Sequence, residues 1–318
     1  MSSYYKDTQY KKKLNERIQL KVTKKKVKIV ISENLCIYEP SQRDYTLNLL
    51  GLISAYAVGK WIPVHIDMSN CQRVTAAASV MLFAEISRAR IATENDDIVT
   101  LDFPEKGQSC RTALNNIGWI HAASISYRKI NTLFEHDAIF QSGNNPGKAT
   151  ASVYKQLVDS GVPLTAPEVK KFTKGVTEAM LNVNHHAYDN EKEPLNGIGR
   201  RWWQLCLVRT DENDKPTKLL FIIYDLGQGI LRSLPKKVGE SNLDQIGRAM
   251  TYGVTRTKES DRGKGSEDML DAAEIKDNSV LYIGTNSVTY TKMYDMAPII
   301  EPCSIPFFGT IVEWQINL

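Results

Sequence analysis

The sequence has no long hydrophobic run and no clustered cysteines. In its 318 residues no apolar stretch approaches the ~20 residues that a membrane-spanning helix needs. The first charged residues are not followed by an apolar segment, which argues against a secretory signal. The five cysteines are scattered, without a C-x-x-C pair or a Cys/His cluster, so neither a zinc site nor a disulfide framework is expected. We therefore expect a cytoplasmic protein with reduced thiols and no membrane partner.

What the sequence does have is a strongly basic N-terminus. Residues 1–28 contain ten basic and two acidic residues, whereas the whole chain carries a formal net charge of only +4. We expect residues 1–24 to form a basic arm, which is either solvated or contributes a first strand at Arg17–Val22. An alternative is that residues 1–28 bind nucleic acid, because such a charge would neutralise several phosphates.

The length predicts about two domains at ~150 residues per domain. The first, over residues 25–135, alternates β-branched apolar runs with segments whose apolar residues recur at helical spacing. The predicted strands are 27–31, 35–38, 61–68 and 98–103, and the predicted helices are 41–60, 75–92 and 110–117. This alternation favours an α/β domain with some parallel pairing.

Parts of this first domain have a family resemblance. The segments that carry it are His65–Ser69, Thr75–Ala78, Leu101–Pro104, Arg111–Leu114 and Ile117–Gly118. They resemble the central strand and helix, and the closing strand and helix, of STAS domains, the fold of bacterial anti-sigma-factor antagonists. In that family a serine at the helix start accepts a phosphate. The matching positions here are Thr75 and Ala76, and we expect Thr75 to cap the helix instead. The resemblance implies a docking domain for a protein partner, without the usual phosphoacceptor.

Residues 136–152 are rich in Gly, Asn, Ser and Pro and predict a linker. The second domain then covers residues 153–318. Its first strong signal is the capping box Thr165–Glu168, which predicts a helix as far as about Tyr188. Three polar residues spaced four apart share one face of this helix: Glu178, Asn182 and His186.

Three further motifs follow in the second domain. A predicted buried strand, Leu219–Tyr224, runs directly into Asp225-Leu-Gly227-Gln-Gly229, where the glycines let the backbone approach a ligand closely. A carboxylate at the end of a buried strand is costly unless it has a partner. The next motif is glycine-rich and cationic, as anion-binding turns are, and consists of Arg262, Gly263, Lys264 and Gly265. A final strand begins at Gly309-Thr310.

In this order the four motifs resemble the Bergerat fold of the GHKL ATPases, which include gyrase, MutL, histidine kinases and anti-sigma-factor serine kinases. The fold implied is an N-terminal STAS-like α/β domain followed by a Bergerat-fold α/β sandwich. The resemblance implies ATP and Mg²⁺ as ligands, with residues 231–262 as a lid. It implies that Asn182 ligates Mg²⁺ and that Asp225 and Thr310 bind adenine. The other nucleotide-binding residues would be His186, Gly227, Gly229, Arg262, Gly263, Lys264 and Gly265.

The reaction that the resemblance implies, ATP hydrolysis or phosphate transfer to a hydroxyl, depends on Glu178. It precedes Asn182 by one helical turn, where the hydrolytic and serine-kinase branches keep a glutamate that polarises the attacking water or hydroxyl. Glu178 would therefore be the catalytic base. No upstream helical region carries a phosphoacceptor histidine, so a sensor histidine kinase is not expected. Ser266 departs from the apolar residue usual after the second glycine, and this puts the lid hinge in question.

Three functions are consistent with these features. The leading hypothesis is a slowly hydrolysing Mg-ATPase that acts as a nucleotide-controlled switch for a protein partner docked on the STAS-like domain, in a signalling or defence system. The first alternative is a serine/threonine protein kinase of the anti-sigma-factor type, which uses the same base on a protein hydroxyl. The second is a nucleic-acid-associated regulator held by the basic arm. Homodimer formation is compatible with each of them.

Overall fold

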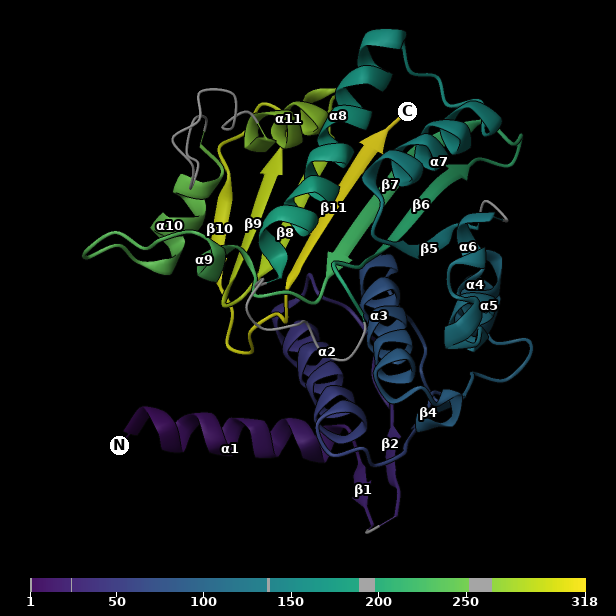
Figure 1. The fold of residues 1–318 in the computed structure, drawn as a ribbon, viewed down its shortest axis with the longest axis vertical. Helices are drawn as coiled ribbons and strands as arrows, with labels where there is room; N and C mark the ends of the chain where they lie inside the picture. Colours follow the sequence, from purple (N-terminus) through teal and green to yellow (C-terminus); the bar gives the residue numbers. More distant parts are fainter. Residues whose placement is uncertain (1, 24, 136–137, 189–197, 252–264) are drawn as a thin grey trace. The chain divides into compact units, whose positions relative to one another are not determined.

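The computed structural model describes residues 2–23, 25–135, 138–188, 198–251 and 265–318, with only the backbone for residues 2–7 (Figure 1). The chain divides into two compact units, Met1–Ile130 with Leu195–Ile198, and Asn131–Pro194 with Gly199–Leu318. Each unit combines helices with a β-sheet, so the mixed α/β class is confirmed. Within the described residues, none of the helices has the length and apolar character that crossing a bilayer requires.

The first unit is built on a sheet of four strands in the order β1-β2-β3-β4. The strands are β1 (Leu20–Val22), β2 (Val27–Val30), β3 (Val64–Asp67) and β4 (Val99–Asp102). β1 pairs antiparallel with β2, and β2, β3 and β4 run parallel. Buried and half-buried residues alternate along β2 and β3, so one face of the sheet supplies the core of this unit.

Helices fill out the first unit. They are α1 (Ser2–Arg17), α2 (Pro40–Ile53), α3 (Ala76–Thr93), α4 (Ser109–Asn116) and α5 (Trp119–Ser124), with a π-helical turn at Ser54–Val58 and 3-10 turns at Asp96–Ile98 and Tyr127–Lys129. The hydroxyl of Thr75 accepts a hydrogen bond from the Ala78 N–H, so the predicted N-cap of α3 is confirmed.

Two sequence-based expectations for the first unit need correction. Residues 35–38 do not form a strand, because Leu35 makes only an isolated bridge to Val74. The N-terminal arm, for which no helix was expected, forms α1, whose residues 8, 9, 11–13 and 16 are exposed to solvent. Leu14 and Ile18, four residues apart, are both fully buried, and the Asn48 side-chain amide donates to Asn15 Oδ1 at 2.9 Å. Because β1 also pairs within the sheet, the basic segment belongs to the first unit.

The second unit contains an antiparallel sheet of seven strands in the order β10-β9-β8-β11-β7-β6-β5. The strands are β5 (Phe140–Gly143), β6 (Trp202–Thr210), β7 (Pro216–Asp225), β8 (Val280–Thr285), β9 (Val288–Met293), β10 (Ile299–Pro302) and β11 (Thr310–Asn317). The helices are α6 (Thr132–Glu135), α7 (Pro146–Asp159), α8 (Ala166–Asn182), α9 (Ile230–Ser233), α10 (Asn242–Ala249) and α11 (Gly265–Asp271), with a π-helical turn at Val183–Ala187 and a 3-10 turn at Ala272–Glu274.

The core of the second unit lies between one face of the sheet and the helices α7, α8 and α11 (Figure 1). Phe172 of α8 packs edge-to-face on Phe221 of β7, with ring centroids 6.1 Å apart. The indole N–H of Trp314 in β11 donates to the Met269 carbonyl of α11 at 2.9 Å. The predicted capping box of Thr165 and Glu168 is present at the start of α8. The residues on α8 are thereby held at fixed positions over the sheet.

The segment expected to be a linker, residues 136–152, is structured over its described part. β5 pairs with β6, and α7 begins at Pro146. The Asn145 side chain caps α7 by accepting the Lys148 N–H at 3.0 Å. The Gly, Asn and Pro residues therefore form the turn between a buried strand and a helix. The division between the two units falls earlier, after Ile130.

A glycine sets the distance between α8 and α11. A Cβ built on Gly175 would lie 2.7 Å from the Asp268 carbonyl oxygen and 2.8 Å from the Ala272 Cβ. We expect Gly175→Ala to lower the free energy of unfolding by about 1–3 kcal/mol because the α11 backbone would have to move. The matched control is Gly147→Ala in α7, whose Cβ would meet nothing closer than 3.6 Å. Urea denaturation followed by circular dichroism measures both, and a Gly175→Ala as stable as Gly147→Ala would contradict the close approach.

Candidate functional site

Asp225 is the last residue of β7 and is buried. It lies opposite Thr310, the first residue of β11, in the register of the two strands. Its Oδ1 accepts a hydrogen bond from the Gly227 N–H at 2.8 Å. Burial raises the pKa of Asp225 to about 7, although hydrogen bonds from the backbone at Gly227 and Thr310 act to lower it. The sheet therefore holds a carboxyl group that titrates near neutral pH.

The glycines beside Asp225 are needed because a side chain at their positions would clash with neighbouring atoms of the protein. A Cβ on Gly227 would lie 2.2 Å from the Ala187 carbonyl oxygen, and a Cβ on Gly309 would lie 2.0 Å from the Asp225 carbonyl oxygen. Gly229 has a φ of +79°, a conformation that side chains other than glycine rarely adopt. The sequence suggested that Gly227 and Gly229 make room for a ligand. In the structure they first make room for neighbouring backbone and for a side chain, since a Cβ on Gly229 would meet the Asn286 amide at 2.4 Å.

The loop after β7 is attached to the end of the α8 region. The Gln228 N–H donates to the Ala187 carbonyl at 2.7 Å, and the Gln228 side-chain amide donates to the His186 carbonyl at 2.9 Å. The Tyr188 hydroxyl accepts the Leu226 N–H at 3.2 Å. The π-helical turn that follows α8 and the residues after β7, about 40 positions apart in the sequence, thus meet at one place.

A polar network joins the same loop to the start of β11. The hydroxyls of Thr310 and Thr285 lie 3.2 Å apart, and Thr285 Oγ1 also accepts the Ile230 N–H at 2.9 Å. The Asn286 side chain accepts the Leu231 N–H at 3.0 Å. The sequence did not single out Thr285 and Asn286. Thr285 ends β8 and Asn286 follows it in the turn to β9, a position typical of any hairpin, and their hydrogen bonds to the loop after β7 depend on long-range strand pairing.

Glu178 lies on α8 against the start of α11. Its Oε2 is only 2.8 Å from the position that a Cβ on Gly265 would occupy. Burial raises the pKa of Glu178, and the nearby Asp268 carboxylate raises it further, while the Lys174 ammonium lowers it. Lys174 pairs with Asp268 at 2.5 Å. The structure thereby brings Glu178 together with Gly265, the described glycine of the second glycine-rich motif.

Asn182 and His186 continue the polar row of α8. Asn182 is exposed, and its side-chain N–H₂ donates to the Met269 sulfur at 3.6 Å. His186 is also exposed, in the π-helical turn, and its ring packs edge-to-face on His185. From Glu178 to Ala187 the helical backbone spans roughly 13 Å at 1.5 Å per residue. One helix thus connects the carboxyl group at Glu178 with the loop that follows Asp225.

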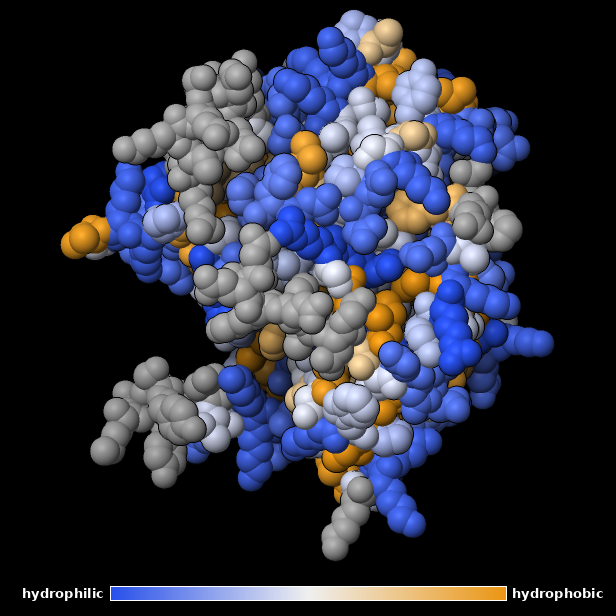
Figure 2. Space-filling model, in the orientation of Figure 1, coloured by the Kyte–Doolittle hydropathy of each residue, from blue (hydrophilic) through white to orange (hydrophobic). Residues whose placement is uncertain are grey.

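The remaining predicted phosphate residues, Arg262, Gly263 and Lys264, lie outside the described residues. Part of the predicted lid, 231–262, is described and is well organised. α10 begins with a capping box formed by Ser241 and Asp244, and the Gln245 side chain donates to the carbonyls of Leu231 and Leu234. The loop between α9 and α10 carries the fully exposed Val238, and Figure 2 shows a hydrophobic group at its tip.

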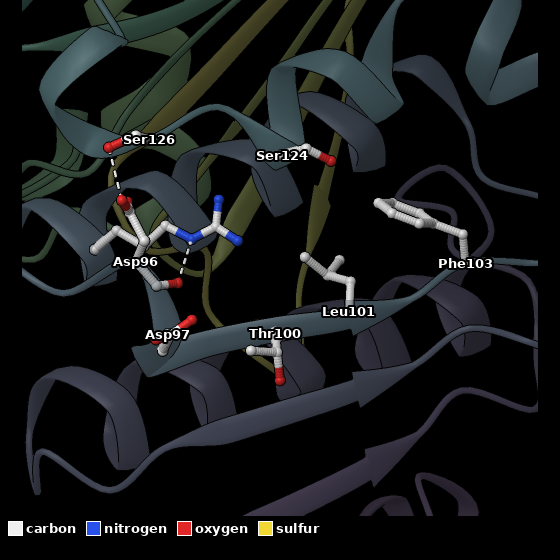
Figure 3. A pocket seen from close by; sticks show the side chains of 8 residues that line it. Asp96, Asp97, Thr100, Leu101, Phe103, Ser124 and Ser126 are labelled. Atoms are coloured by element: carbon white, nitrogen blue, oxygen red, sulfur yellow. Dashed lines mark hydrogen bonds between the residues drawn. The ribbon is translucent and has the colours of Figure 1, made fainter.

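The first unit has a separate pocket of about 340 Å³ beside β4, lined in part by Leu101 and Phe103 (Figure 3). The Arg90 guanidinium at this pocket donates to backbone carbonyls, including those of Val99 at 2.9 Å and Asp96 at 3.0 Å. The Asp96 carboxylate accepts the Ser126 hydroxyl at 2.6 Å (Figure 3). These polar groups hold β4 and the segment after α5 in place, so we assign the pocket no ligand.

No family model, curated protein or solved structure matches this chain. The resemblance to STAS domains and to GHKL ATPases therefore rests on the sequence motifs alone.

Proposed function

We propose that the second unit binds ATP with Mg²⁺ between the end of β7 and the polar row of α8, and hydrolyses it slowly. The nucleotide state would control a protein partner that docks on the first, STAS-like unit. The observation that supports this most is the buried Asp225 carboxyl, beside a loop that is hydrogen-bonded to the π-helical turn after α8. The proposed family assignments, a Bergerat-fold ATPase for the second unit and a STAS domain for the first, rest on the sequence resemblances described above.

A buried carboxyl with a raised pKa costs folding free energy, so it is a candidate for ligand recognition. Asp225 could accept a hydrogen bond from the exocyclic amino group of adenine. The Thr310 hydroxyl belongs to the adjoining polar network and lies 3.2 Å from the Thr285 hydroxyl. Together, Asp225 and Thr310 would recognise the edge of the adenine ring through hydrogen bonds at the end of the sheet.

Asn182 would hold Mg²⁺ through its amide oxygen. In the part of the chain that the structure describes, no three His, Cys, Asp or Glu residues gather into a metal site. An ion held at Asn182 would therefore need water and nucleotide phosphate oxygens as its other ligands, which is how Mg²⁺ is usually bound. The bound ion would neutralise phosphate charge during the reaction.

Glu178 would accept the proton of the attacking water. Its raised pKa makes the carboxylate a stronger base than an exposed glutamate. The serine/threonine-kinase alternative differs only in the nucleophile, which would be a protein hydroxyl. Incubation with labelled ATP and candidate partners separates the two, because transfer leaves labelled protein whereas hydrolysis releases only phosphate.

Calorimetric titration with ATP, with and without Mg²⁺, tests the proposal. We expect Asp225→Ala to weaken ATP binding by about tenfold to 100-fold, because a hydrogen bond to a charged group is lost. The matched control is Asp211→Ala at the opposite end of the β6–β7 hairpin. Asp211 Oδ1 also accepts two backbone N–H groups, at 2.8 and 3.0 Å, but is exposed. Unchanged affinity in Asp225→Ala would show that the site is misassigned, and no ATP binding by the wild type would refute the function.

A further inference from the structure

We propose that one end of the first unit's sheet binds single-stranded nucleic acid. This site, the hairpin surface, consists of the β1–β2 hairpin and the loop before β3. Its exposed residues are Lys21, Val22, Lys25, Lys26, Lys60 and Trp61. The proposal uses no residue of the nucleotide site and is independent of ATP binding. The earlier alternative assigned nucleic acid to all of residues 1–28, whereas the structure points to a smaller, composite surface.

Backbone hydrogen bonds bring the two parts of the hairpin surface together. The turn after β1 is closed by the Thr23 N–H, which donates to the Lys26 carbonyl at 3.0 Å. The next residue, Val27, donates its N–H to the Pro63 carbonyl at 2.9 Å. Val27 then lies opposite Val64 in the parallel pairing of β2 and β3. The lysines of the turn and the segment before β3 therefore lie side by side.

Trp61 is the aromatic residue of this surface. Its side chain is 61% exposed, which is unusual for so large an apolar group. Its φ is +56°, an outlier for a bulky residue and a form of strain that often marks functional positions. The Ile62 N–H donates to the Tyr56 carbonyl at 2.9 Å and so fixes this loop. An indole held in solvent offers a face on which a nucleobase can stack.

The charge of the hairpin surface is uncompensated in the described structure. Among the described residues, Lys21, Lys25 and Lys26 have no ion-pair partner. The neighbouring basic residues differ, because Lys28 pairs with Asp67 at 2.8 Å and Arg17 pairs with Glu33.

The sequence around the hairpin surface is also free of acids. Residues 18–32 and 54–66 contain no Asp or Glu. The acidic residues at this end of the sheet, Glu94, Asp96 and Asp97, precede β4, and β3 separates β4 from β2. The positive charge is therefore concentrated on the β1–β2 side.

This combination favours a polynucleotide over a lipid surface. Ammonium groups beside an exposed aromatic ring can contact successive phosphates while a base stacks, independently of sequence. A membrane would be bound mainly through apolar insertion plus charge, and only Val22 and Trp61 are exposed large apolar residues on this surface. Single strands are favoured over duplex because their bases are accessible for stacking.

Fluorescence anisotropy of the full chain with labelled 20-nucleotide single-stranded DNA and RNA tests the proposal, in ~50 and ~200 mM salt. We expect Trp61→Ala to weaken binding by about fivefold to 100-fold with little change in salt dependence. The triple variant Lys21→Ala, Lys25→Ala, Lys26→Ala should weaken it at least tenfold. It should also make the dependence of log K on log salt less steep, with a slope that is smaller in magnitude by about 2, at ~0.7 per phosphate contact. Comparing the affinities for the same base sequence as DNA and as RNA shows whether deoxyribose or ribose is preferred.

The matched control removes the same charge from α1, through Lys11→Ala, Lys12→Ala and Lys13→Ala. This variant should retain affinity within about threefold, since its lysines lie outside the hairpin surface. Equal losses in the two triple variants would overturn the proposal, because net charge alone would then explain binding. Failure of the wild type to bind either strand would also overturn it. So would binding to vesicles containing phosphatidylserine without binding to oligonucleotides, which would identify a membrane surface instead.

Discussion

Replacing Glu178 by glutamine is expected to lower the rate of ATP hydrolysis by about 100-fold or more, while ATP binding stays nearly unchanged. Glutamine has almost the same shape but cannot accept a proton from water. In the structure Glu178 is half-buried beside Gly265, and burial followed by the Asp268 charge raises its pKa. The raised pKa strengthens the base, and it also means that activity should decline as the pH falls and Glu178 becomes protonated.

Single-turnover phosphate release measures the chemical step, and calorimetry measures ATP affinity on the same samples. The matched control is Glu168→Gln at the start of the same helix. There the Lys276 ammonium, 2.7 Å away, and the Thr165 N–H hold the pKa of Glu168 at about 2. That variant loses part of a helix cap and should hydrolyse ATP normally. If Glu178→Gln hydrolyses ATP at the wild-type rate, Glu178 is not the base. If it loses ATP affinity as well, its role is structural.

Features that depend on a few adjacent residues were predictable from the sequence. The N-cap at Thr75 and the capping box at Thr165 need only a short side chain and the next turn of helix, and both are present. The buried end of β7 at Asp225 follows from an apolar run that stops at a carboxylate. In each case local hydrogen bonding and burial decide the structure.

Features that depend on distant partners were not predictable. Residues 140–143 have the composition of a loop, but they pair with β6 along the edge of the sheet. The link from Asn286 to the loop after β7 requires β8 and β11 to be paired first, and no short pattern encodes that. Residues 35–38 show the reverse error, since they are apolar and β-branched without having a strand to pair with beyond one bridge. Tertiary context overrides propensity at these positions.

The free energy of unfolding of the wild type, relative to Asp225→Asn, is expected to fall by up to about 4 kcal/mol as the pH rises from about 4 to above 7. Burial raises the pKa of Asp225 from 3.8 to about 7 in the folded protein. Between these two values the folded state keeps the proton that the unfolded state has released, so stability decreases with rising pH. Below this range both states are protonated, and above it both are ionised, so the difference becomes constant.

Urea unfolding of the wild type and Asp225→Asn at several pH values measures this difference, and groups common to both proteins cancel. The control is Asp211→Asn, since backbone hydrogen bonds from Lys215 and Asn213 lower the pKa of Asp211. Stability from Asp211 is present above its unfolded-state pKa and is lost only as the pH falls through the lowered value. Its wild-type-minus-variant difference should therefore be flat from about pH 5 upward. A flat difference for Asp225→Asn as well would mean that this carboxyl is solvated, and would remove the main support for a ligand-recognition role at the end of β7.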